Sequence, residues 1–200
     1  MQTQYIFLAL GWVIYFALHS LLASLKLKNY LNYHFPIISR YYRLVYNAWA
    51  ILSLIFLLRW QFSFQEKTIW IVGYNQLIIS YLLIFLGILI IMGAFKNYNL
   101  KEFSGLDAWQ SADNQRDTLK ISGLNAYVRH PIYTGTLLFI VGFFFQKPSL
   151  ANLLLSLIVL IYLDLGIRFE EAKLNQVFGE AYREYQKKVK KIILKKKSWN

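Results

Sequence analysis

Residues 77–95 read LIISYLLIFLGILIIMGAF, nineteen residues without a charged side chain. Four further uncharged runs occur, at 1–25, 44–58, 131–146 and 148–163. Apolar and aromatic residues make up 57% of the 200-residue chain, and charged residues only 16%. Soluble domains usually carry roughly 25% charged residues, and uncharged runs of this length are typical of membrane spans. The sequence therefore predicts an integral membrane protein.

The runs predict an all-α fold, a polytopic membrane helix bundle in a single domain over 1–200. About five spans are expected, at 4–24, 41–59, 76–95, 131–146 and 149–167. The last two are short, since 16 residues at about 1.5 Å each reach about 24 Å against a hydrocarbon core of roughly 30 Å. Whether this hairpin crosses fully is left open. A hydrophilic loop, 96–130, and a tail, 168–200, complete the chain, and we expect the tail to form one amphipathic helix.

Basic residues alternate between the predicted loops. Of the 22 Lys and Arg residues, nineteen lie in 25–43, 96–130 and the tail, and three in the other connections. By the positive-inside rule, the amino terminus is predicted outside and the carboxyl terminus in the cytoplasm. A bacterial inner membrane fits this topology. The lysines after about residue 186 are interpreted as an anchor to anionic lipid without a catalytic role.

Composition also limits the chemistry. The absence of cysteine excludes disulfides, thiolate metal sites and a cysteine nucleophile. The three histidines have no metal-ligand spacing, so no metal site is predicted. The net charge of +12 is explained by membrane topology, and no nucleic-acid partner is predicted. Oligomeric state has no signal in the sequence.

Polar residues gather at the predicted cytoplasmic ends of the spans, where burying an ionisable group is costly and suggests function. Each group also has a purely structural interpretation. Arg43 can be a snorkelling anchor and His19 a hydrogen-bonded helix end, and Asp164 and Arg168 can form a local ion pair four residues apart. Arg129-His130 can be an interfacial flank, and Glu170-Glu171 a solvated helix face. If the ends lie at one depth, they can form one pocket. The groups are His19-Ser20, Arg43 with Asn47, Arg129-His130, Asp164 with Arg168, and Glu170-Glu171.

Two motifs that follow each other along the chain indicate a function more specifically than these polar groups do. Residues 121–135 read ISGLNAYVRHPIYTG, and Glu170-Glu171 and Phe178-Gly179 follow, then Tyr182 and Tyr185. In this order and spacing the chain resembles the membrane methyltransferases that include isoprenylcysteine carboxyl methyltransferases and phospholipid N-methyltransferases. Further stretches at 18–24, 42–47 and 103–106 are similar to the bacterial branch that includes methanethiol S-methyltransferases.

The resemblance implies S-adenosylmethionine as cofactor, bound near the cytoplasmic ends of the last helices. Asn125 stands where relatives often carry tyrosine, so an aromatic wall comes from Tyr127 or is missing. Arg168 is the nearest cation to a substrate-side arginine of the relatives, about two positions out of step. The implied cofactor-binding residues are Thr118, Leu119 and Lys120 in a strand-like segment, Asn125, Tyr127, Arg129, His130, Pro131, Tyr133, Glu170 and Glu171; His19, Arg43 and Arg168 are the candidate catalytic residues.

These residue types suit methyl transfer. A cation at a helix start suits a carboxylate, and Glu170 suits an ammonium or a ribose diol. In-line displacement from an activated sulfonium needs alignment and exclusion of water, without a metal. A thiol or amine acceptor also loses a proton, which His19 or His130 can take. The expected partners are membrane lipids and a small-molecule or lipid acceptor, with thiol, carboxylate and headgroup left open.

Two alternatives remain. One is an NADPH-dependent membrane reductase of the sterol-reductase type, which shares an Arg-His helix start. The other is a non-catalytic membrane module in which polar groups only hold helices together.

Overall fold

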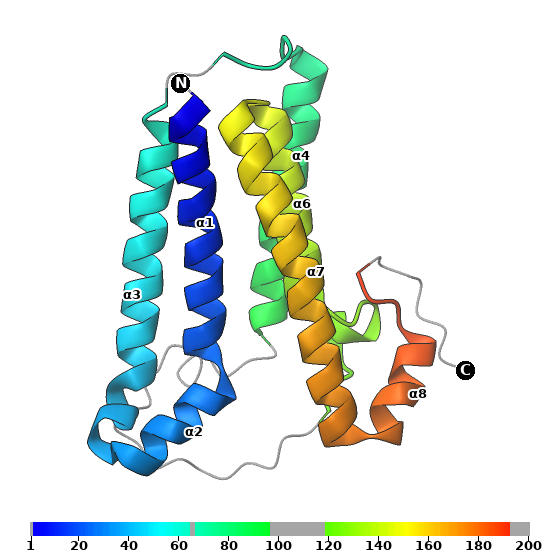
Figure 1. Cartoon of the computed structure of the whole chain (residues 1–200). Coiled ribbons are helices and arrows are strands. Elements are labelled where there is room, and N and C mark those ends of the chain that lie inside the picture. Colours follow the sequence, from blue (N-terminus) through cyan, green and yellow to red (C-terminus); the bar gives the residue numbers. More distant parts are fainter. Residues whose placement is uncertain (1, 65–66, 97–118, 193–200) are drawn as a thin grey trace. The chain divides into compact units, whose positions relative to one another are not determined.

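The computed structural model describes residues 2–64, 67–96 and 119–192 (Figure 1). Within these residues every regular element is a helix, which confirms the predicted all-helical fold. The described residues before Thr68 form one compact unit, and those from Thr68 onward form a second. That the two units act as one domain stays a prediction.

The first unit consists of α1 (Gln2–Ala23), α2 (Leu25–His34) and α3 (Pro36–Phe62). A buried polar pair joins the two long helices, because the Trp12 indole N–H donates to the Gln61 side-chain oxygen at 2.8 Å. Both side chains are almost fully buried. A hydrogen bond satisfies both groups where water is excluded, so it fixes the register of α1 against α3.

The helix α2 corrects the sequence analysis, which treated 25–43 as a connecting loop. Ser24 caps α2 by accepting a hydrogen bond from the Leu27 N–H at 3.4 Å, and Pro36 occupies the first turn of α3. Capping by serine and proline at a helix start are local signals. The sequence analysis missed these two signals because lysine and leucine alternate in this short segment, which is not a helical pattern.

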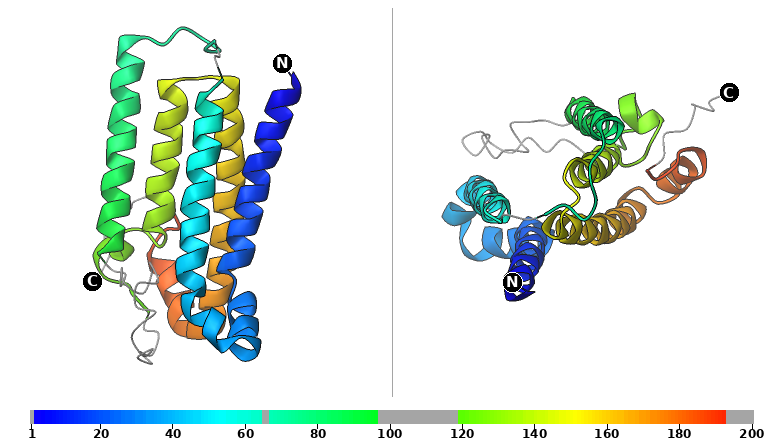
Figure 2. Two further views of the ribbon diagram at one scale, coloured as in Figure 1. Left: turned by 90° about the vertical axis from the view of Figure 1, so that its left-hand side faces the viewer. Right: turned by 90° about the horizontal axis from the view of Figure 1, so that it is seen from above.

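The second unit consists of α4 (Tyr74–Phe95), η1 (Gly123–Ala126), α6 (Pro131–Gln146), α7 (Leu150–Phe178) and α8 (Glu180–Lys188). Small residues allow α4 and α6 to pack backbone to backbone, side by side in both views (Figure 2). A Cβ added to Gly87 would lie 2.6 Å from the Gly135 carbonyl oxygen, and one added to Gly135 would lie 2.6 Å from the Gly87 carbonyl oxygen. Such contacts are typical of helix packing in membranes.

The predicted hairpin is confirmed. α6 has the predicted bounds, and Ser149 caps α7 by accepting a hydrogen bond from the Asn152 N–H at 3.3 Å. Among the residues that the structure describes, four helices are long and apolar enough to cross a membrane: α1, α3 from Tyr41, α4 and α7. α6 is apolar but shorter, with 16 residues. The chain is thus an integral membrane protein built from a helical bundle, and its orientation stays a prediction.

A C-terminal amphipathic helix is present as predicted, in α8, but the tail is not one continuous helix, so that part of the prediction was wrong. α7 continues to Phe178, Gly179 has φ +54°, and α8 starts at Glu180. Because a positive φ interrupts a right-handed helix and favours glycine, the chain turns here. The apolar face of α8 is buried inside the unit, where Tyr182, Tyr185 and Val189 form a cluster. Leu119, Leu174 and Phe178 pack against it.

Replacing Gly135 by serine should destabilise the second unit, since its Cβ would lie within 2.7 Å of both a carbonyl oxygen and the Ile91 side chain. Overpacking of this kind costs about 1–3 kcal/mol. Gly73→Ser is the matched control. Gly73 is the N-cap residue of α4, a Cβ added there has no atom within 4 Å, and serine is a good N-cap residue. Thermal unfolding in detergent should give a lower Tm for Gly135→Ser alone. Equal Tm values would contradict the close packing.

Candidate functional site

The site starts with the turn that leads into α6. Gly123, with φ +61°, starts η1, and Pro131 takes the first turn of α6, where its missing N–H has no cost. Between them, the Asn125 side-chain amide donates to the Arg129 carbonyl oxygen at 3.2 Å. The Tyr185 hydroxyl of α8 donates to the Asn125 carbonyl oxygen. The turn is therefore held against α8.

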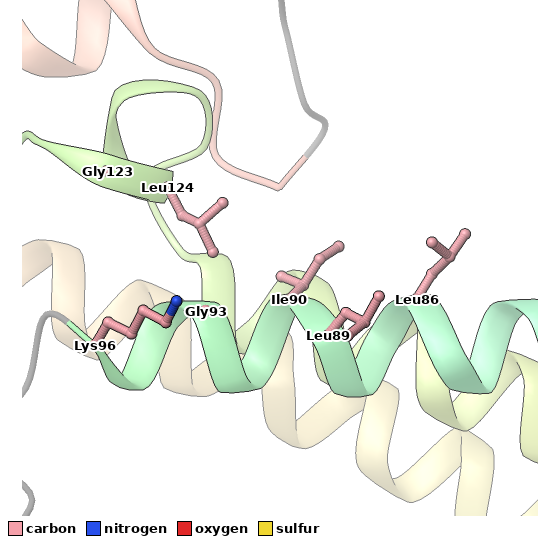
Figure 3. A pocket seen from close by; sticks show the side chains of 7 residues that line it. All are labelled: Leu86, Leu89, Ile90, Gly93, Lys96, Gly123 and Leu124. Carbon is pink, nitrogen blue, oxygen red and sulfur yellow. The ribbon is translucent and has the colours of Figure 1, made fainter.

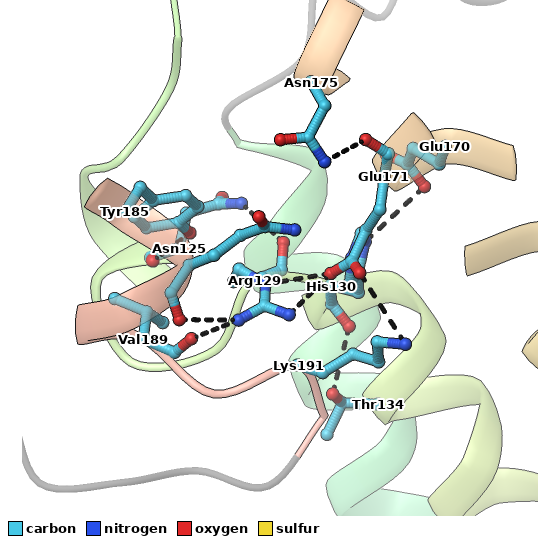
Figure 4. Close-up of polar contacts among 11 residues, drawn as sticks. Asn125, Arg129, His130, Thr134, Glu170, Glu171, Asn175, Tyr185, Val189 and Lys191 are labelled. Atoms are coloured by element: carbon cyan, nitrogen blue, oxygen red, sulfur yellow. Dashed lines mark hydrogen bonds and ion pairs between the residues drawn. The ribbon is translucent and has the colours of Figure 1, made fainter. Parts of the chain in front are cut away.

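Arg129 connects three segments (Figure 4). Its Nε and Nη2 donate to Glu171 Oε1 of α7 at 2.9 and 2.7 Å. Its Nη1 donates to the carbonyl oxygens of Val189 and Gln186, at 2.6 and 3.1 Å. Of the five N–H donors of a guanidinium, at least four point at groups of the protein itself. The side chain is only 10% exposed, so the observed role of Arg129 is to tie the site together.

His130 lies next to both glutamates. Its side chain is buried, with Nε2 3.1 Å from Glu171 Oε1 and Nδ1 3.5 Å from Glu170 Oε2. The ring meets Tyr133 edge to face at 5.6 Å between centroids. The two carboxylates hold the imidazole from both ring nitrogens and so fix its orientation.

Residues 189–192 form a strap over the start of α6. The Arg129 and His130 N–H groups donate to the carbonyl oxygens of Lys190 and Lys191, at 2.9 and 3.2 Å. Lys191 Nζ also lies 3.7 Å from Glu171 Oε2. The carbonyl oxygens of the strap therefore accept hydrogen bonds from the two backbone N–H groups that directly precede α6. α8 ends at Lys188, and residues 189–192 return to the site, which the sequence analysis did not predict; binding of the lysines to anionic lipid stays a prediction.

The paired glutamates differ in their surroundings. Glu171 is 14% exposed and faces Arg129, His130 and Lys191. Glu170 is 38% exposed, and its ion pair with His130 is the longer of the two. The arrangement thus has one carboxylate that is engaged inside the protein and one that is accessible.

The other predicted site residues lie as follows. Pro131 is buried, Tyr133 also contacts Gly166, and Leu119 packs on the α8 cluster. Leu119 and Lys120 have no regular structure, so the strand-like expectation was wrong, and Thr118 lies outside the described residues. Lys120 and Tyr127 are exposed. Their role in binding a cofactor, like that of the other residues predicted, stays a prediction.

Arg168 does not join this cluster. Its Nε donates to Asp164 Oδ2 at 2.8 Å on an exposed face of α7, which is the local ion pair given as the structural interpretation of these two residues. His19 and Arg43 lie in the first unit, on α1 and α3. The Tyr46 hydroxyl lies 3.0 and 3.1 Å from the two His19 ring nitrogens. Tyr46 was not predicted as a site residue, although it follows Arg43 on one helix face.

A groove of about 440 Å³ runs along α4 and η1 (Figure 3). Its walls are Leu86, Leu89, Ile90, Gly93, Gly123 and Leu124, and Lys96 is its charged end. η1 also contains Asn125, so the groove and the polar cluster share one turn. The groove is therefore apolar except at Lys96.

Comparisons with known proteins give a consistent result. Residues 75–181 match the phospholipid methyltransferase family. Methanethiol S-methyltransferase 1 of Bradyrhizobium diazoefficiens is 32% identical over 160 residues, which cover 76% of this chain and 54% of that protein. The methanethiol S-methyltransferase of Pseudomonas deceptionensis is 33% identical over 101 residues, 50% of this chain and 36% of that protein.

A third relative, protein-S-isoprenylcysteine O-methyltransferase of Schizosaccharomyces pombe, is 37% identical over 83 residues. These cover 40% of this chain and 34% of the relative. The chain thus matches about half or less of the length of these relatives. No solved structure matches it significantly.

Replacing Glu171 by glutamine should destabilise the second unit, because it removes the charge that Arg129, His130 and Lys191 share. A largely buried, charge-assisted network of this kind contributes about 1–3 kcal/mol. Glu184→Gln is the control, since Glu184 also pairs with a lysine but is exposed. Differential scanning calorimetry should show a lower Tm only for Glu171→Gln. An equal Tm in both variants would mean that the cluster does not stabilise the fold.

Proposed function

Because the chain belongs to the phospholipid methyltransferase family, we propose that it is a membrane methyltransferase that uses S-adenosylmethionine and methylates a small or lipophilic acceptor. The family match at 75–181 includes Arg129, His130 and both glutamates. The observation that supports the proposal most is the convergence of these four residues, from the start of α6 and the end of α7.

The residues of the site fit this cofactor chemically. S-Adenosylmethionine supplies a methyl group on a positively charged sulfonium and carries a carboxylate, an ammonium and a ribose diol. Glu170, the accessible carboxylate, suits the ammonium or the diol. Lys191 is partly exposed, and we propose it for the carboxylate, since the Arg129 guanidinium is occupied by Glu171 and two carbonyl oxygens. Asn125, Tyr127, Tyr133, Leu119 and Lys120 are proposed as neighbouring walls.

The remaining residues have proposed roles in the transfer. The protein must align the acceptor with the methyl carbon and exclude water, which needs no covalent intermediate. A thiol acceptor must lose its proton, and His19 is proposed as the base because its ring lies next to the Tyr46 hydroxyl. Arg43 and Arg168 are proposed on the acceptor side, as the resemblance implies.

Two acceptor classes have support. Several relatives are named for methanethiol, which favours a small thiol. The apolar groove along α4, with Lys96 at its end, favours a lipophilic acceptor with an anionic group.

Titration calorimetry with S-adenosylhomocysteine tests the proposal, with NADPH in parallel. The detergent-solubilised protein should bind the nucleoside thioether, and Glu170→Gln should weaken binding ten- to hundredfold, about what a lost charge-assisted hydrogen bond costs. Glu180→Gln is the control, because Glu180 is an exposed carboxylate of α8 that pairs with Arg183.

The other outcomes distinguish the alternatives. Binding of NADPH alone would favour the reductase. A folded protein that binds neither compound would favour the non-catalytic module.

Filling the groove distinguishes the acceptor classes. At Gly93 an added Cβ would lie 3.0 Å from Leu124 Cδ1, so Gly93→Phe should occupy the groove. If the acceptor is lipophilic, its methylation should fall at least tenfold, while that of a small thiol is unchanged. Ile88→Phe, on α4 but outside the groove, is the control. Unchanged methylation of lipophilic acceptors would mean that the groove does not hold them.

A further inference from the structure

Tyr182 is a buried phenol whose hydroxyl has no hydrogen-bond partner among the described residues. The residue is 1% exposed and belongs to the apolar cluster of α8. Leaving a buried hydroxyl unpaired costs about 1–3 kcal/mol, so such groups are rare and need an explanation. Tyr185, three residues later, has a partner in the Asn125 carbonyl oxygen. The two hydroxyls of one helix face therefore differ.

The position of Tyr182 connects it with the paired glutamates. Its cluster packs against Leu174 and Phe178 of α7. Glu170 and Glu171 precede Leu174 by four and three residues, so they lie on the same face of that helix, one turn away. Leu119, from the segment expected to bind the cofactor, packs on the same cluster. Tyr182 thus lies among elements that the proposed cofactor site shares.

The electrostatic surroundings define what the hydroxyl can bind. Burial and the negative charges of Glu171 and Glu170 raise the pKa of Tyr182 well above its usual range, and the opposing charge of Arg129 only partly offsets them. The phenol is therefore neutral at physiological pH, and its oxygen keeps lone pairs that can accept hydrogen bonds. A negative potential around an acceptor oxygen favours a cationic donor.

We propose that the Tyr182 hydroxyl oxygen accepts a hydrogen bond from the amino-acid ammonium group of the methyl donor, next to the Glu170 carboxylate. The inference rests on the proposed function and assigns this group to a residue of α8. Tyr182 is then a binding residue whose partner is the ligand itself, which accounts for its unpaired hydroxyl.

The test compares ligand affinity and ligand-free stability in Tyr182→Phe. S-Adenosylhomocysteine contains the ammonium group, whereas 5′-methylthioadenosine lacks the amino-acid part. Calorimetry should show about tenfold weaker binding of S-adenosylhomocysteine and unchanged binding of 5′-methylthioadenosine. The Tm of the ligand-free variant should be equal or higher, since an unpaired polar group has been removed.

Two further variants serve as controls. Tyr185→Phe should lower the Tm, because the Asn125 carbonyl oxygen loses its donor. Tyr81→Phe removes an exposed hydroxyl of α4 that accepts a hydrogen bond from Gln146, at the opposite end of α6, and should leave the affinity for S-adenosylhomocysteine unchanged.

Three results would overturn the inference while the proposed function stands. The first is equal affinity of Tyr182→Phe and the unmodified protein for S-adenosylhomocysteine. The second is an equal loss of affinity for S-adenosylhomocysteine and 5′-methylthioadenosine. The third is a lower Tm of ligand-free Tyr182→Phe, which would mean that the hydroxyl has a structural partner. If the unmodified protein binds neither S-adenosylhomocysteine nor 5′-methylthioadenosine, the proposed function itself is wrong.

Discussion

The Glu171 carboxylate holds the second unit together. Glu171 lies on α7. It contacts Arg129 and His130, which precede α6, and Lys191 of the strap after α8. Charges at the end of an apolar helix are costly unless they are paired, so the segments that carry the partners must stay close. This requirement keeps Arg129 inside the protein and leaves Glu170, its neighbour in sequence, at the accessible edge. Two adjacent glutamates thereby differ: Glu171 is engaged within the fold, and Glu170 stays accessible, where we propose that it binds the cofactor.

The packing of α4 against α6 sets the framework for this cluster. Glycines at 87, 135 and 142 bring the two backbones together, and α6 then presents Arg129 and His130 at its start. Ser149 starts α7, which returns to the level of His130 and carries both glutamates. The polar site thus depends on apolar contacts along the helices, which require small residues and not only hydrophobic ones.

Much of the fold followed from the sequence, because uncharged runs and helix-start residues act locally. The bounds of α6 followed from its uncharged run, and the four-residue spacing of Asp164 and Arg168 indicated the local ion pair as their structural interpretation. The Arg-His-Pro motif and the paired glutamates were recognised as a site, and the structure brings them together. Part of what failed depends on contacts between distant segments. No local pattern shows that Lys190 and Lys191 return to Arg129, since a lysine-rich stretch has the same composition on a membrane surface and in a strap. The break at Gly179 depends on a backbone angle that a glycine permits but does not require.

The strap has a consequence for how the protein folds. Arg129 and Val189 are 60 residues apart in sequence, and the α6–α7 hairpin lies between them. Closing a loop of this length costs conformational entropy before any contact is gained. A preformed α6–α7 hairpin shortens the effective loop, so this cost is lower if the two helices pair before α8 docks. We therefore expect the polar cluster, which needs the docked strap, to be the last part of this unit to assemble.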